Sequence, residues 1–276
     1  MWAGLRVSFA TEPGSPAKPN EDFVQATPRV VAVLDGLGVP GGLPTGCVHG
    51  TPWFVTRLGG QLVRLATDHP DHDLQDLAAT AIEAVATTHA DTCDLDHPGT
   101  PSSSITLLRV GEETVDYLVV HDSVVVLDGP DGHVAVSDLR GTSVARQEHL
   151  DTEKYLIGTP EHNESLRRLV TAQRPHRNTD SGYWVAASKP ETAQHALTGS
   201  LPKASVQRAA LLTDGAAAYV ETYGIADWPT TMDLLEQHGP GELVARVRAT
   251  ESTDPLGSTW PRYKRSDDAT AAFCLL

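Results

Sequence analysis

The chain has 276 residues, enough for one large domain or two small ones, and its 40% hydrophobic and 21% charged residues exclude wholesale disorder. Its 36 Asp and Glu residues outnumber its 21 Lys and Arg residues, so the formal net charge is −15. That charge argues against a partner held by phosphate neutralisation, such as bulk DNA or RNA.

The first half of the chain combines short strands with two helices. Apolar runs predict strands over 5–10, 23–26 and 30–34, the last of which ends in Asp35-Gly36. Glycine and proline predict a loop over 36–44. Apolar residues at helical spacing then predict helices over 51–67 and 74–88.

The second half is richer in strands and ends on one. Runs of Val, Ile, Leu and Thr predict strands over 104–110, 114–127 and 133–137, followed by a polar segment over 141–180 with a helix over 163–172. We further expect strands over 182–187, 193–197, 204–212 and 270–276, and helices near 232–236 and 241–250. Helices interspersed in pairs among strands indicate an α+β fold on mainly antiparallel sheet. Because no long linker divides the chain, we expect a single domain over 1–276.

The cysteines and the N-terminus bear on location. Cys47, Cys93 and Cys274 are far apart, form no disulfide framework and lack a C-x-x-C zinc signature, which favours a reducing, cytoplasmic compartment. The N-terminus has no cationic start followed by an apolar stretch, so we expect no signal peptide. Since no apolar run approaches the ~20 residues of a membrane helix, we expect no membrane association.

Two local patterns look like ligand sites but fit poorly. Residues 36–41 match G-x-G-x-x-G after a strand, but Asp35 would put a negative charge beside a pyrophosphate and Pro40 interrupts the expected helix. We therefore expect no dinucleotide there. Residues 89–97 include His89 and Cys93 among several aspartates, but no known ligand spacing fits, so we interpret them as a solvated loop.

Carboxylates recur at the edges of predicted strands. An unpaired carboxylate is costly to bury at the end of an apolar strand, so five such places in one chain ask for a common cause. A shared divalent cation supplies one, and hard oxygen ligands suit Mg²⁺ or Mn²⁺. The residues concerned are Glu21 with Asp22, Asp35, Asp122, Asp214, and Asp267 with Asp268.

These acidic residues belong to an ordered set of short motifs. The set reads Asn20-Glu21-Asp22, Ala32-Val33-Leu34-Asp35-Gly36, Ser102-Ser103-Ser104, His121-Asp122-Ser123, Leu212-Thr213-Asp214-Gly215 and Asp267-Asp268-Ala269-Thr270. In order and spacing it resembles the PP2C (PPM) family of metal-dependent protein phosphatases, as a divergent bacterial-type member. Each motif is weak alone, but together they cover almost the whole chain.

The resemblance implies a fold and an activity. The fold is a PP2C-like four-layer αββα sandwich, with two central antiparallel β-sheets flanked by helix pairs and a metal centre at one end. The activity is hydrolysis of phosphoserine or phosphothreonine in a protein by a hydroxide that bridges two Mn²⁺ or Mg²⁺ ions. No nucleophilic side chain is then needed.

The resemblance also assigns metal ligands. Asp35 would bridge both ions, and Gly36 would add its backbone carbonyl. Asp214 and Asp267 would hold one metal. The remaining assignments are Asp22 acting largely through bound water, Glu21 nearby, and Asp122 at the position linked in some members to a third, weaker metal.

Outside the metal ligands the sequence departs from the family pattern. An arginine that holds the substrate phosphate is replaced by Ala17, and the nearest cation, Lys18, offers a point charge rather than a two-pronged grip. His121 stands where the family has glycine, and Val124 where it has arginine. We consider His49 as a proton donor to the leaving group, although a surface or helix-capping role is simpler.

These departures leave three functions open. The first is a protein serine/threonine phosphatase. The second is a phosphatase of the same chemistry that acts on a small phosphorylated metabolite. The third is a pseudophosphatase that keeps the fold and binds a partner without turnover.

Overall fold

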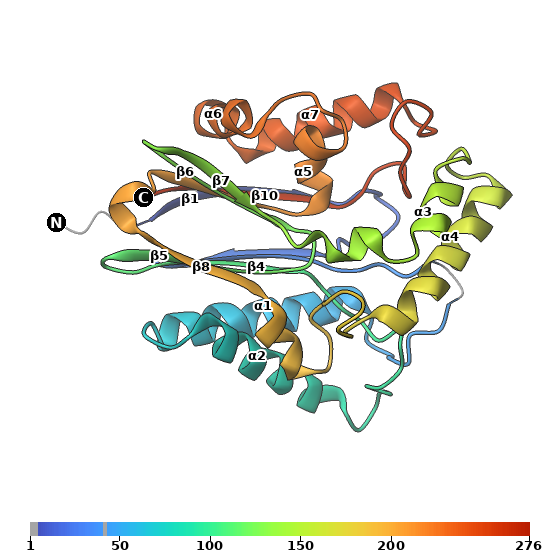
Figure 1. The fold of residues 1–276 in the computed structure, drawn as a ribbon, viewed down its shortest axis with the longest axis horizontal. Helices are drawn as coiled ribbons and strands as arrows, with labels where there is room; N and C mark the ends of the chain where they lie inside the picture. The colour runs from blue at the N-terminus through green and yellow to red at the C-terminus, as the bar shows by residue number, and fades with distance from the viewer. Residues whose placement is uncertain (1–4, 41–42) are drawn as a thin grey trace.

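The computed structural model describes residues 5–40 and 43–276, and within them the strands form two five-stranded antiparallel sheets (Figure 1). One sheet has the order β1 (Arg6–Glu12), β10 (Ala269–Leu275), β9 (Arg208–Leu212), β6 (Val124–Gly129) and β7 (Gly132–Val136). The other has the order β2 (Asp22–Ala26), β3 (Val30–Asp35), β4 (Ile105–Val110), β5 (Thr114–Val120) and β8 (Leu197–Pro202).

Helices cover the outer face of each sheet. The β2–β8 sheet carries α1 (Thr51–Asp68) and α2 (Leu74–His89), and the β1–β7 sheet carries α5 (Asp214–Glu221), α6 (Trp228–His238) and α7 (Pro240–Thr253) (Figure 1). At one end lie α3 (Arg146–Thr152) and α4 (Pro160–Gln173). Short 3₁₀ turns span Leu139–Ser143, Arg174–His176, Pro190–His195 and Lys203–Ser205. The predicted αββα sandwich is thus confirmed.

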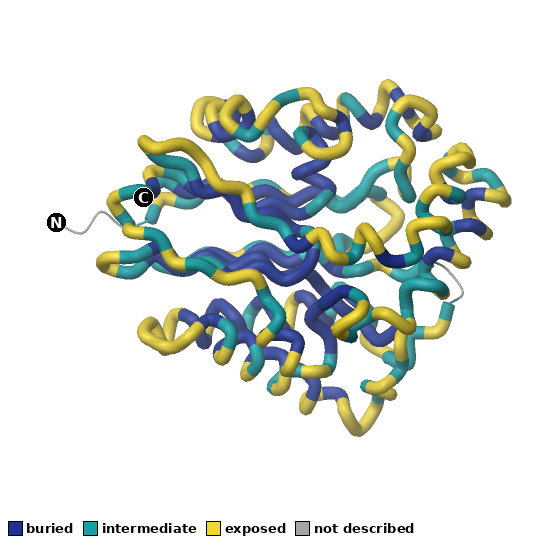
Figure 2. Tube along the Cα trace, viewed as in Figure 1, coloured by how far each residue is buried: buried dark blue, intermediate teal, exposed yellow. Residues whose placement is uncertain are grey.

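Three large apolar clusters fill the interior: one between the two sheets and one between each sheet and its helices. Figure 2 shows the buried residues along both sheets and the inner sides of the helices. Along β3, Val31 and Val33 pack against the other sheet, whereas Val30, Ala32 and Leu34 pack against α1 and α2. All five side chains are fully buried. A strand buried on both faces reads as a continuous apolar run, and this is why 30–34 could be predicted so closely.

Several predicted elements are wrong. The single strand expected over 114–127 is two strands, β5 and β6, which belong to different sheets. The chain turns between them at His121, whose φ is 69°. Because both strands are buried, the apolar run does not reveal the break. Residues 182–187 form only isolated bridges at Tyr183 and Ala186, and residues 193–197 belong mostly to a 3₁₀ turn.

Candidate metal centre

The five aspartates predicted as metal ligands come from strand ends at one end of the sandwich. Asp22 begins β2 and Asp35 ends β3, and the two are directly opposite in the antiparallel register, so their side chains share one face. Asp214 is the first residue of α5, directly after β9, and Asp267 precedes β10. Asp122 lies in the turn between β5 and β6. The site therefore draws on both sheets.

The backbone of Asp35 and Gly36 is held from two sides. The Ser104 amide donates to the Asp35 carbonyl at 2.8 Å, and the Asp35 amide donates to Ser104 Oγ at 3.0 Å. The Gly36 amide donates to the Glu21 carbonyl at 3.1 Å. A Cβ on residue 36 would lie 2.6 Å from that same carbonyl oxygen, so only glycine fits. Ser104 belongs to the Ser102-Ser103-Ser104 motif, and its contacts with Asp35 show that it positions this residue.

Two carboxylate oxygens in this cluster are buried and unpaired. Thr213 Oγ1 donates to Asp22 Oδ2 at 3.0 Å, but Asp22 Oδ1 has no hydrogen-bond partner. Asp214 Oδ1 is likewise buried without a partner. Leaving a buried carboxylate oxygen without a donor is costly. Hard oxygen atoms that lack donors are the ligands that a divalent cation such as Mg²⁺ or Mn²⁺ prefers, so these residues fit the expected metals.

The protonation of the cluster supports the same interpretation. Burial raises the pKa of Asp35 well above its usual range, and the carboxylates of Asp214 and Asp22 raise it further. Burial likewise raises the pKa of Asp214 to about 7, with Asp267 adding to the effect. Without positive charge the cluster therefore holds protons near neutral pH, and a bound cation would reverse this.

Lys264 supplies part of the missing positive charge. Its ammonium donates to Asp267 Oδ1 at 2.5 Å, and the amide of Asp268 donates to the same oxygen at 2.9 Å. The Lys264 side chain is 48% exposed, so the pair is accessible to solvent. Asp268 itself accepts the amides of Gly14 and Glu21, each at 2.7 Å. Lys264 was not predicted as a site residue, although it lies only three residues before Asp267 in the sequence.

Asp122 also has a partner within the chain. Its Oδ1 lies 2.7 Å from His121 Nδ1. Burial by itself lowers the pKa of His121, but the Asp122 carboxylate outweighs burial and raises it. The positive φ of His121 explains why glycine is expected here, since glycine adopts that backbone region without a steric cost.

Comparison with solved structures shows which fold this is, although no family model and no curated protein matches the sequence. The serine/threonine phosphatase PstP/Ppp of Mycobacterium tuberculosis superposes with a TM-score of 0.61 at 15% identity, covering 99% of each chain. The PPM Ser-Thr phosphatase MsPP of Mycobacterium smegmatis, solved with cacodylate, gives a TM-score of 0.55 at 16% identity over 100% of both chains. The PstP catalytic domain in complex with two manganese ions gives 0.57 at 16% identity, with 99% of this chain and 98% of that one covered.

The chain has the PP2C phosphatase fold. The expected resemblance is thereby confirmed at the level of the fold, across nearly the whole chain. The alternative dinucleotide site finds no support, because every strand pair in the described residues is antiparallel and a βαβ unit needs a parallel pair. The last glycine of that motif, Gly41, lies outside the described residues.

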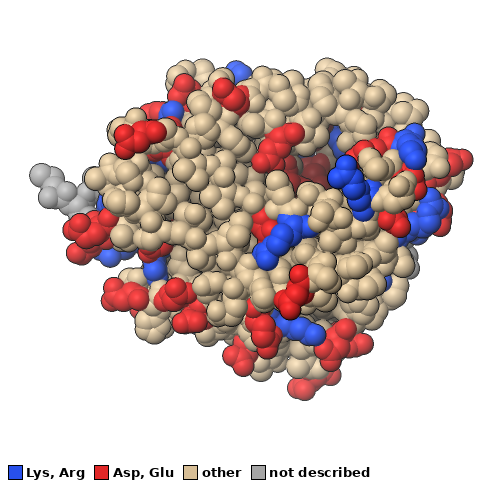
Figure 3. All heavy atoms as spheres, viewed as in Figure 1, with Lys and Arg blue, Asp and Glu red and all other residues tan. Residues whose placement is uncertain are grey.

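A cavity of about 430 Å³ opens beside Asp122. In this PP2C fold α3 forms one wall of the cavity, with Arg146 and His149 facing it, and Tyr183 and Tyr263 form part of another. On the face drawn in Figure 3, a hollow shows acidic atoms within it and basic atoms at its rim. Of the five aspartates predicted as metal ligands, Asp122 is the one that lines this cavity.

The two other predicted site residues lie apart from the carboxylates. Lys18 is exposed in the β1–β2 connection. His49 lies beside Cys47, with 3.6 Å between Nδ1 and Sγ, and its ring stacks on Trp53 at 4.3 Å. Among the described helices none is long and apolar enough to cross a membrane.

Proposed function

We propose that this chain is a Mn²⁺- or Mg²⁺-dependent phosphomonoester hydrolase, acting on phosphoserine or phosphothreonine in proteins. The observation that carries the proposal is the pair of buried, unpaired oxygens on Asp22 and Asp214 beside Asp35 in a PP2C fold. The catalytic domain of PstP, which shares this fold, was solved in complex with two manganese ions. That complex supports our proposal that the aspartate cluster of this chain binds metal ions. Cys47 and Cys93 form no disulfide, which supports our proposal of a cytoplasmic location.

The proposed ligands are those that the family resemblance assigns, and the buried oxygens of the cluster support them. Asp35 and the Gly36 carbonyl would help to hold the ions, together with Asp214 and Asp267, and Asp22 would act largely through water. Asp122 would hold a third ion only by giving up His121. Bound ions supply acidification of a water molecule and neutralisation of charge on the phosphate. Glu21 lies at the edge of this set, where its carbonyl anchors Gly36.

The chain's own residues have separate tasks in this proposal. Ser104 holds the Asp35 backbone so that its carboxylate keeps one position. Arg146 lines the cavity and carries no ion pair among the described residues, so we assign it the grip on the substrate phosphate. Lys18, for which the sequence predicts that role, is not among the residues that line the cavity. An arginine fork fits phosphate oxygens better than a lysine does.

Hydrolysis of p-nitrophenyl phosphate and of a phosphothreonine peptide by the purified chain with Mn²⁺ tests the proposal. We expect turnover that EDTA abolishes and that Asp35→Asn and Asp214→Asn each reduce by at least about a thousandfold. Asp233→Asn is the matched control, because Asp233 is 57% exposed and pairs only with Arg208 on the surface. Metal-independent hydrolysis, or full activity in either site variant, would refute the proposal. A panel of phosphorylated metabolites run alongside tells whether small molecules are preferred.

One observation favours a second candidate, a pseudophosphatase that binds a partner. Lys264 already neutralises Asp267, and His121 already neutralises Asp122. These two ion pairs reduce the negative charge that would attract cations to the site. Calorimetric titration with Mn²⁺ separates the candidates, because the enzyme binds two ions and an inert binding module need not bind any.

A further inference from the structure

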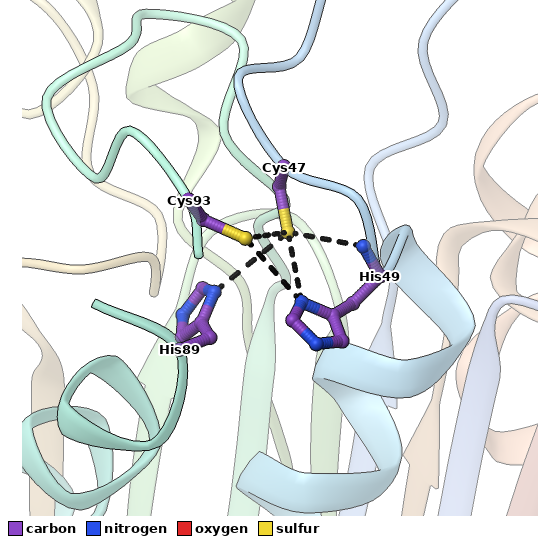
Figure 4. Close-up of side chains that lie close together, drawn as sticks. All are labelled: Cys47, His49, His89 and Cys93. Carbon is purple, nitrogen blue, oxygen red and sulfur yellow. Dashed lines mark hydrogen bonds between the residues drawn. The ribbon is translucent and has the colours of Figure 1, made fainter. Parts of the chain in front are cut away.

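A second cluster of side chains lies away from the carboxylates, where the segment before α1 meets the end of α2. Figure 4 shows Cys47, His49, His89 and Cys93 with their sulfur and nitrogen atoms turned toward one another. Cys47 and His49 belong to the segment before α1, His89 is the last residue of α2, and Cys93 follows in the next turn. One ligand atom from each residue lies within 4.8 Å of all the others.

The sulfur–nitrogen distances are close to those around a single tetrahedral ion, whereas the two sulfur atoms lie closer together than such an ion would hold them. With Zn–S near 2.3 Å and Zn–N near 2.0–2.1 Å, tetrahedral geometry separates sulfur from nitrogen by about 3.6 Å and sulfur from sulfur by about 3.8 Å. Cys47 Sγ lies 3.6 Å from His49 Nδ1 and 3.7 Å from His89 Nδ1. Cys93 Sγ lies 3.3 Å from His49 Nδ1 and 3.2 Å from Cys47 Sγ.

Neighbouring groups hold these side chains in place. Trp53 stacks on His49 and contacts His89 with a ring separation of 5.0 Å, so one indole orients both imidazoles. The His49 amide lies 3.4 Å from Cys47 Sγ and donates to it, and amide donors of this kind stabilise a thiolate. The Cys93 amide donates to the His89 carbonyl at 3.0 Å, which fixes the turn that presents both residues.

We propose that Cys47, His49, His89 and Cys93 bind one Zn²⁺ ion. Two thiolates and two imidazoles are the ligand set of many structural zinc sites, and four protein ligands leave no open position for substrate. The ion would therefore be structural. It would join the segment before α1 to the end of α2, and so would fix the entry into α1.

The alternative occupant of this position is a disulfide between the two nearby cysteines. A disulfide needs about 2.05 Å between the sulfur atoms and makes no use of the histidines. At 3.2 Å the sulfurs of Cys47 and Cys93 are not bonded, and both face imidazole nitrogens. The arrangement as a whole is thus explained by a metal and only partly by a disulfide.

Metal analysis of the purified full-length chain tests the proposal. We expect one zinc per chain after dialysis against a weak chelator, and loss of that zinc in Cys47→Ser and in Cys93→Ser. Cys274→Ala is the matched control and keeps the zinc, since Cys274 is buried in β10. Asp214→Asn also keeps it, which separates this site from the proposed phosphatase centre.

A spectroscopic readout covers the case in which a cysteine variant fails to fold. Co²⁺ exchanged into the wild-type chain should give the intense absorption of tetrahedral cobalt with thiolate ligands, and His49→Ala should weaken it while leaving the far-ultraviolet circular dichroism unchanged. Absence of zinc from reduced, zinc-supplemented protein would overturn the proposal. So would a Cys47–Cys93 disulfide in non-reduced peptide maps, or cobalt spectra that lack thiolate bands.

Discussion

Replacing Asp214 by asparagine should make the metal-free protein more stable, although the same change should abolish phosphatase activity. In the folded chain burial raises the pKa of Asp214 from 3.8 to about 7. The unfolded chain has the ordinary value, so it releases its proton near pH 4 while the folded chain keeps it until about pH 7. Between these values the folded state loses stability as pH rises.

The size of the effect follows from the shift. About three pKa units at 1.36 kcal/mol each correspond to about 4 kcal/mol of stability lost by pH 8. Asparagine has nearly the same shape and never ionises, so Asp214→Asn avoids this loss at pH 8 and gains nothing at pH 4. For a chain of this size 4 kcal/mol corresponds to a rise in Tm of about 10 °C.

Thermal and urea unfolding in EDTA at pH 4.5 and pH 8 measure this difference. Saturating Mn²⁺ should reverse the order, because the wild type binds the ions and the variant does not. Asp254→Asn is a control for which we expect the opposite change in stability. Burial raises the Asp254 pKa, but its hydrogen-bond donors outweigh this and hold it well below the usual range. The ionised Asp254 carboxylate therefore stabilises the folded chain above about pH 4, and this stabilisation is lost as the pH falls further. The Asp254→Asn variant should thus be less stable than the wild type at pH 8.

One result would refute the electrostatic reasoning about Asp214. If Asp214→Asn destabilises the metal-free chain equally at both pH values, the carboxylate is an ordinary hydrogen-bonding group rather than a buried charge without a partner. A variant that still gains several degrees from Mn²⁺ would contradict the assignment of Asp214 as a ligand.

The remaining predictions concern α1 and Lys264. Gly60→Ala should raise the free energy of unfolding by about 1 kcal/mol, because a Cβ there meets no atom within 4 Å, whereas Gly59→Ala should lower it, because its Cβ would lie 2.2 Å from the Phe23 ring. Equal effects of the two substitutions in thermal melts would contradict the packing of α1 on β2. Lys264→Met should lower the Mn²⁺ dissociation constant about fivefold in calorimetry, since it removes an ion pair to Asp267 worth about 1 kcal/mol. Weaker Mn²⁺ binding would show that Lys264 does not compete with the cation.

Residues near one another in the chain account for most of the successful predictions. The run 30–34 identified β3, and helical spacing over 51–67 identified α1, whose observed bounds are Thr51–Asp68. α5 was missed because Asp214-Gly215 looks like a turn that closes a strand, whereas it begins a helix. The break at His121 was missed because the apolar runs that end at Val120 and resume at Val124 are equally buried, so Asp122 and Ser123 were interpreted as an interruption of one strand.

The order of the acidic motifs carried the family resemblance, and the resemblance implied the fold that the structure confirms. The strand-edge positions of Asp22, Asp35, Asp122, Asp214 and Asp267 could be predicted because the apolar pattern of each strand is local. The contacts between side chains that lie far apart in the sequence could not be predicted from these motifs. The gathering of Cys47 and His49 with His89 and Cys93 depends on how the connections between strands and helices fold back. Each half of the four-residue cluster is too short to form a motif, and only the packing of α1 against α2 brings the halves within reach of one ion.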